Sequence, residues 1–162
     1  MTPELLISWL NDAYAMEQAQ IRMLERFSTD FEPYPDIRSE LRQHLIETRQ
    51  QLDDIRECLT TLGVAPRAAQ RPTPIQGLYP DSSHVTFKED ELVKNLLVLH
   101  ACEHYEHITY LALAEGARQA SQDEIADICE RIAEEEMAMA EWVEEQVPVV
   151  VAICAAATHE QA

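Results

Sequence analysis

The stretch Leu96–Ala114 (LLVLHACEHYEHITYLALA) most constrains what this chain can fold into. An α-helix advances about 100° per residue, and on that period its apolar residues form one continuous stripe. Glu103 lies near the centre of the stripe, and His107 lies one turn later on the same side. His100 and Glu106 lie on its flanks. An unpaired ionised carboxylate costs several kcal/mol to bury, so we expect Glu103 to be protonated, hydrogen-bonded or bound to a cation.

Length and composition predict one all-α domain. The chain has 162 residues and only three glycines, which favours helix over turn-rich β structure. Apolar residues recur at three- and four-residue steps in four segments of about 25 residues each. The expected helices run from Thr2-Pro3 to about Ser28, from a cap at Asp36 to Gly63, from the capping box Thr86-x-x-Glu89 to about Arg118, and from the capping box Ser121-x-x-Glu124 to Pro148.

Residues 64–85 are rich in proline and predict a long crossover between the second and third helices. Short first and last connections with one long crossover describe a four-helix bundle of the ferritin type. We therefore predict a bundle over residues 1–147. Pro148 should end the fourth helix, leaving residues 148–162 as an apolar tail. The tail is too short to span a membrane and is expected to form a short helix or strand, or an oligomer contact.

Four glutamates lie near the midpoints of the four expected helices: Glu17, Glu47, Glu103 and Glu136. Antiparallel packing would bring these midpoints to one level. Glu17, Glu103 and Glu136 lie near the centres of their apolar stripes, whereas Glu47 lies toward an edge. Bundles of this architecture place such carboxylates around two metal ions. The pattern predicts a carboxylate-rich metal site, with His107 as the best placed imidazole.

Each glutamate taken alone is also explained by a side-chain stem that covers the core while the carboxylate stays in water. The three histidines of the third helix, His100, His104 and His107, are typical of zinc ligands, but a second His or Cys cluster is missing. The four cysteines are scattered without a Cys-x-x-Cys pair, as expected for thiols used as small apolar residues in a reducing compartment.

The formal charge of −18 makes nucleic acids and anionic membrane surfaces poor partners and favours cations. The N-terminal residues lack the basic and long apolar regions of a signal peptide, and no stretch approaches the ~20 apolar residues of a membrane span. These features predict a cytoplasmic protein.

Three segments resemble the ferritin-like superfamily, and within it a bacterial stress-associated group long catalogued as a domain of unknown function. They are LNDAYAMEQAQIRML, HLIETRQQLDDIRECLTTLG and CEHYEHITY, the last being the most specific. The resemblance implies that Glu17, Glu47, Glu103, Glu106 and Glu136 match metal-binding positions. Neither Glu-x-x-His motif is intact, because Gln50 and Gln51 follow Glu47, and Met139 and Ala140 follow Glu136.

The leading hypothesis is a ferritin-like protein that binds iron or manganese, as one or two ions, with metal oxidation or consumption of peroxide or oxygen in a stress response. Whether it is an enzyme of the di-metal oxidase or peroxidase type stays open. The alternative is a non-enzymatic stress or assembly protein with a degenerate site. A zinc hydrolase is the least favoured. We expect a homodimer or a higher oligomer.

Overall fold

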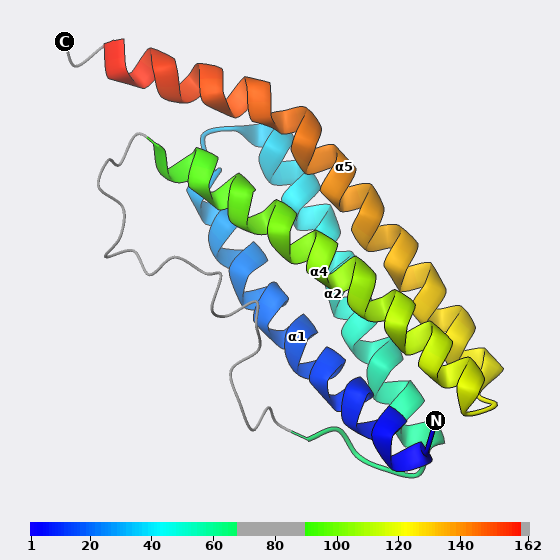
Figure 1. Ribbon diagram of the computed structural model, residues 1–162. Coiled ribbons are helices and arrows are strands. Elements are labelled where there is room, and N and C mark those ends of the chain that lie inside the picture. The colour runs from blue at the N-terminus through cyan, green and yellow to red at the C-terminus, as the bar shows by residue number, and fades with distance from the viewer. Residues whose placement is uncertain (68–89, 160–162) are drawn as a thin grey trace.

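Four helices form the bundle of the computed structural model, which describes residues 1–67 and 90–159 (Figure 1). The helices are α1 (Pro3–Asp30), α2 (Pro35–Thr61), α4 (Glu91–Gln119) and α5 (Asp123–His159). This confirms the predicted all-α four-helix bundle. It also confirms the first helix start and the ends of the first three helices to within about two residues.

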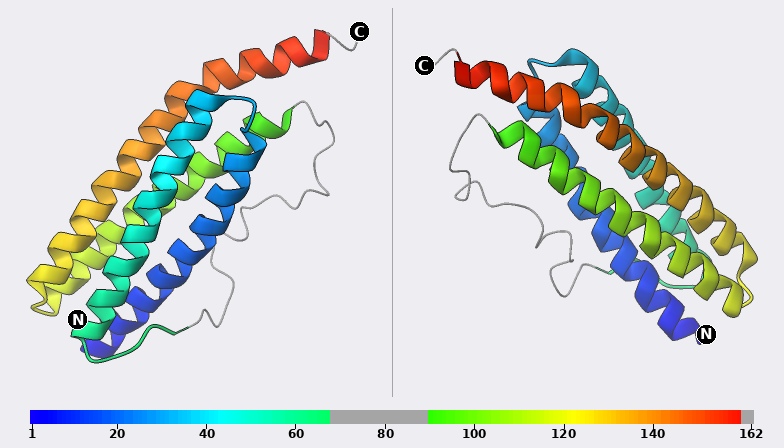
Figure 2. Two further views of the ribbon diagram at one scale, coloured as in Figure 1. Left: turned by 180° about the vertical axis from the view of Figure 1, so that it is seen from behind. Right: turned by 45° about the horizontal axis from the view of Figure 1, so that its top comes forward.

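The helices pack in a ring. α1 packs against α2 and α4, and α5 packs against α4 and α2. α1 and α5 run in one direction, and α2 and α4 run in the other (Figure 1, Figure 2). The chain between α2 and α4, residues 62–90, therefore joins opposite ends of the bundle, as a long crossover must. The predicted capping box Thr86-x-x-Glu89 lies outside the described residues.

Local hydrogen bonds explain two helix ends that the sequence predicts. The Thr2 hydroxyl accepts a hydrogen bond from the Leu5 amide at 3.4 Å, which caps α1 just before Pro3. Gly63 follows α2 with φ +78°, a conformation that glycine adopts without strain. Its amide donates to the Thr60 carbonyl, and the next amide, of Val64, donates to Leu59, which is the Schellman end of a helix.

Two predicted N-caps are wrong. α2 begins at Pro35 after Tyr34, so Asp36 lies inside the first turn rather than at the cap. Ser121 has φ +57° and closes α4 instead of opening α5. Its amide donates to the Arg118 carbonyl at 2.9 Å, and α5 begins only at Asp123. Short polar residues occur both at the N-terminal caps of helices and at their C-terminal ends, and the sequence pattern alone does not distinguish the two positions.

The predicted helix end at Pro148 is also wrong. α5 continues through Pro148 to His159 and turns away from its first half in this region (Figure 1). Proline removes one backbone donor and crowds the carbonyl four residues earlier, which bends a helix without necessarily ending it. Val150 is completely buried, whereas Val149 and Val151 are 50% and 46% exposed. The apolar stretch after Pro148 is therefore helix that packs on the bundle through one side.

The core lies along the bundle axis and is formed by the apolar stripes of all four helices. Cys58, Cys102 and Cys129 are buried free thiols in it, as predicted for cysteines used as small apolar residues. Within the described residues, no helix has the length and apolar character needed to cross a membrane.

Candidate metal centre

Four carboxylates meet in the middle of the bundle. Glu17 of α1, Glu103 and Glu106 of α4, and Glu136 of α5 are each at most 1% exposed. We call these four residues the buried carboxylate cluster. Glu136 faces inward, as its position in the apolar stripe predicts, whereas the preceding Glu134 is exposed and Glu135 is half-buried. Ionised together, four such groups would repel one another strongly in a low-dielectric interior.

Two neutral side chains hold part of the cluster in place. The Tyr110 hydroxyl donates a hydrogen bond to Glu17 Oε1. The Gln20 amide, one turn after Glu17 on α1, donates to Glu103 Oε1 at 2.5 Å. Gln20 and Tyr110 are completely buried, so these contacts fix the orientation of two carboxylates without supplying a positive charge.

His44 of α2 is the imidazole of the site. Its Nε2 lies 3.2 Å from Glu103 Oε2 and 3.6 Å from Glu136 Oε2. One ligand atom from each of His44, Glu103 and Glu136 lies within 4.8 Å of the other two, and all three residues are buried. Two carboxylate oxygens and one imidazole nitrogen at this separation suit a single divalent transition-metal ion.

Several buried oxygens of the cluster have no hydrogen-bond partner. They are Glu17 Oε2 and both carboxylate oxygens of Glu106 and of Glu136. The ion pairs of arginine and lysine in the described chain involve other carboxylates, which lie nearer the surface. Buried polar atoms are normally paired, so this group of unpaired oxygens fits a site that binds cations.

Burial sets the protonation of the site. It raises the pKa of Glu17 from 4.5 to about 8, against the lowering effect of the Tyr110 hydrogen bond. Burial, together with the neighbouring carboxylates, also raises the pKa of Glu106 and that of Glu136. Burial is the largest single effect on His44 and acts to lower its pKa, but the charge and hydrogen bond of Glu103, with Glu47 and Glu136, together outweigh burial and raise the pKa of His44 well above 6.5. Without a cation, protons therefore neutralise the site.

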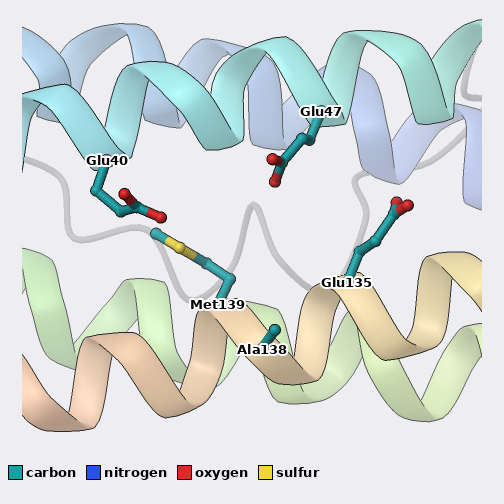
Figure 3. Close-up of a pocket in the computed structure, with 5 residues that line it drawn as sticks. All are labelled: Glu40, Glu47, Glu135, Ala138 and Met139. Atoms are coloured by element: carbon teal, nitrogen blue, oxygen red, sulfur yellow. The ribbon is translucent and has the colours of Figure 1, made fainter.

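Glu47 lies at the rim of the site rather than inside it. Its side chain is 42% exposed, and its Oε2 lies 3.5 Å from His44 Nδ1. This contact with His44 lowers the pKa of Glu47. A hollow of about 310 Å³ opens here between α2 and α5. Figure 3 shows Glu40 and Glu47 from α2 on one side of it, opposite Glu135 and Met139 from α5.

His107 takes no part in these contacts. It is half-buried, and its Nδ1 donates to the Ala133 carbonyl of α5 at 2.8 Å. Its predicted role as a ligand stays a prediction. Glu106, expected on a flank of the apolar stripe, is instead buried. The reason is that α4 packs against both α5 and α1, and most extensively against α5, so residues on the flanks of its apolar stripe are also covered.

A family model described as "Domain of unknown function (DUF892)" matches residues 2–156 of the chain. The protein belongs to this family. The match includes most of the C-terminal stretch after Pro148, which the sequence resemblance leaves out.

Three solved structures share the fold. A protein from Xanthomonas campestris is 32% identical, with a TM-score of 0.81 over 99% of this chain and 98% of its own. YcfI from Rhodopseudomonas palustris is 25% identical, with a TM-score of 0.72 over 89% of this chain and 94% of its own. The E. coli stress protein YciF is 23% identical, with a TM-score of 0.76 over 93% of this chain and 98% of its own.

In this member of the DUF892 family, sequence reasoning places His44 on the apolar side of its helix, as a possible partner of a carboxylate, but leaves His44 and Gln20 out of the predicted site residues. His44 precedes Glu47 by three residues on α2, so it reverses the order of a Glu-x-x-His motif. Its position on the apolar side of the helix is the available signal, but a hydrogen-bonded core histidine leaves the same pattern. Gln20 gives no distinguishing signal, because a buried glutamine identifies its partner only in three dimensions.

Proposed function

We propose that this protein is ferritin-like and binds iron or manganese, as one ion or two, in the buried carboxylate cluster together with His44. The observation that carries the proposal is the set of buried carboxylate oxygens on Glu17, Glu106 and Glu136 that have no hydrogen-bond partner. Oxygen ligands with one imidazole suit Mn²⁺ and Fe²⁺, whereas a thiolate-preferring ion would find no sulfur ligand in the cluster.

In this proposal the chain's own groups provide a fixed and dry site. His44, Glu103 and Glu136 hold the cation, and Glu17 and Glu106 supply further oxygens. Tyr110 and Gln20 orient Glu17 and Glu103 through their hydrogen bonds. When bound, iron or manganese would supply one-electron redox chemistry towards peroxide or oxygen, which is the oxidase or peroxidase activity we propose.

The hollow between α2 and α5 supports a route for cations to the site. It is lined by Glu40, Glu47 and Glu135, whose charges attract cations from solvent. Glu47 contacts His44 Nδ1, and Nε2 of the same ring faces Glu103 and Glu136. We propose that Glu47 takes up the cation at the rim before the buried carboxylates bind it.

A non-enzymatic stress or assembly protein is the second candidate. The observation that favours it is that Tyr110 and Gln20 already satisfy one oxygen each of Glu17 and Glu103. With the other carboxylates protonated, these buried polar side chains would form a hydrogen-bonded layer that is stable without a cation. The layer would then only stabilise the bundle. A role in stress response is proposed under both candidates, since the similarly folded YciF is described as a stress protein.

Metal binding tests the proposal. We expect protein produced without chelators to contain iron or manganese by elemental analysis, and chelator-treated protein to bind Mn²⁺ in calorimetric titrations. The double substitution Glu17→Gln and Glu103→Gln should abolish both, because amides keep the shape of the side chains but not their charge. Glu136→Gln alone should weaken Mn²⁺ binding about tenfold or more.

The matched control is the double substitution Glu115→Gln and Glu141→Gln. It removes the same two charges from exposed positions of α4 and α5 and should leave Mn²⁺ binding unchanged. Wild-type protein with neither bound metal nor a shift in melting temperature with Mn²⁺ or Fe²⁺ would contradict the proposal and support the second candidate.

A further inference from the structure

A second group of ligand side chains lies on the outer side of the α4–α5 pair. His100 and His104 are one turn apart on α4, and Glu144 lies opposite them on α5. His104 and Glu144 are exposed and His100 is half-buried, so none of the three belongs to the buried carboxylate cluster. We call these residues the surface histidine site.

The ring nitrogens of this site face one another. His104 Nε2 lies 3.1 Å from His100 Nε2, and His100 Nε2 lies 2.9 Å from Glu144 Oε1. The two rings meet edge to face, with centroids 4.5 Å apart. Ligand atoms at ~2.0–2.1 Å from a tetrahedral ion lie ~3.3 Å apart, so these spacings approach those around one metal ion.

His100 Nε2 in a neutral ring cannot make both of these contacts as hydrogen bonds. In a neutral ring this nitrogen carries either one proton or one lone pair. A proton donated to Glu144 leaves no lone pair on His100 Nε2 for His104 Nε2, and a lone pair turned to His104 leaves the Glu144 contact without a proton. A cation between the three atoms would instead use a lone pair from each.

We propose that His100, His104 and Glu144 form a surface site for a borderline transition-metal ion, namely Zn²⁺, Cu²⁺ or Ni²⁺. Two imidazoles at positions i and i+4 of a helix are a preformed bidentate ligand for such ions, and a carboxylate from the next helix adds a third donor. Mg²⁺ and Ca²⁺ prefer all-oxygen sites and are disfavoured. The site is distinct from the buried one in its residues, its exposure and its nitrogen-rich ligands.

Zinc titration of the full-length chain, in competition with a chromophoric chelator, tests this proposal. The protein should carry Glu17→Gln and Glu103→Gln, which disable the buried cluster. We expect one Zn²⁺ per chain to bind in this background. Adding His100→Ala and His104→Ala should remove that equivalent, and Glu144→Gln should weaken binding about tenfold. Glu145→Gln, at the adjacent exposed position, is the matched control and should have no effect.

Electron paramagnetic resonance of bound Cu²⁺ gives an independent readout. We expect hyperfine coupling to two imidazole nitrogens, reduced to one in His104→Ala. The proposal is overturned if no zinc binds in the cluster-disabled background, or if zinc binds there with unchanged stoichiometry and affinity after both histidines are replaced. The substitutions at His100, His104 and Glu144 change no residue of the buried carboxylate cluster. A failure of zinc binding at the surface histidine site therefore does not bear on manganese binding in the core of the wild-type protein.

Discussion

At the scale of single residues, the feature that matters most is the pairing of buried acidic groups with neutral donors. Tyr110 and Gln20 each donate to one carboxylate, and neither adds positive charge. A lysine at either position would form a buried ion pair and would compete with any cation. Neutral donors instead orient the carboxylates without forming ion pairs with them, so the carboxylates can still bind a cation.

Tyr110→Phe tests this pairing. The substitution leaves Glu17 Oε1 buried without its donor, so we expect a loss of about 1–3 kcal/mol in the free energy of unfolding. Urea denaturation of chelator-treated protein measures it. Tyr14→Phe is the control, because Tyr14 on α1 is half-buried and should change stability by less than about 0.5 kcal/mol. Equal losses for both variants would contradict a specific Tyr110–Glu17 bond.

The raised pKa of Glu17 predicts how the stability of the metal-free protein depends on pH. In the folded chain this carboxyl holds its proton to about pH 8, whereas in the unfolded chain it loses it near 4.5. Between these values the folded state binds more protons, so stability is highest below about pH 4.5 for this group and falls as pH rises to about 8. The raised pKa values of Glu106, Glu136 and His44 act in the same direction.

Thermal melts of chelator-treated protein from pH 5 to about pH 8.5 check this expectation. The melting temperature should fall by several degrees across the range, and Glu17→Gln should reduce the slope because an amide does not ionise. Bound Mn²⁺ should remove most of the fall, since the cation replaces the protons. A melting temperature that rises steadily with pH would show that these carboxyls are ionised in the folded protein.

At the scale of the helices, sequence periodicity predicts most of the fold and part of the site. The inward positions of Glu17, Glu103 and Glu136 follow from the 3.6-residue period, and so does the rim position of Glu47. The burial of Glu106 does not follow, because it depends on how extensively α5 and α1 cover α4. Periodicity gives a direction for each side chain but not the width of the arc that packing buries.

Pro148 shows the other limit of sequence reasoning. Its missing donor and its bend cost free energy, which predicts a helix end, but burial of an apolar side chain beyond it offsets part of that cost. The outcome therefore depends on a tertiary contact, namely the complete burial of Val150. No local pattern in the sequence contains that contact.

Val150→Ala tests whether the C-terminal part of α5 is packed helix. Removing two buried methyl groups should cost about 2 kcal/mol in the free energy of unfolding. Val149→Ala and Val151→Ala are matched controls, since both side chains are about half exposed and should each cost less than about 0.5 kcal/mol. Chemical denaturation of the three variants under one condition makes the comparison. Three equally small effects would mean that this segment does not pack on the bundle.

At the scale of the whole molecule, the charge of −18 and the ring of four helices both favour the binding of cations in our account. We propose that the acidic surface concentrates cations, that the hollow between α2 and α5 gives them a way in, and that side chains of the core bind them. The predicted homodimer or higher oligomer and the cytoplasmic location stay predictions. Exposed apolar residues on α4, such as Leu97 and Ile108, make the oligomeric state worth measuring by sedimentation.

The central claim is that a cation binds among the buried carboxylates. The most direct test is anomalous X-ray diffraction from crystals of chelator-treated protein to which Mn²⁺ has been added. The account predicts anomalous density for manganese between His44, Glu103 and Glu136, within reach of Glu17 and Glu106. Saturating Mn²⁺ with no anomalous density in the bundle interior, and with the Tyr110 and Gln20 hydrogen bonds intact, would contradict it.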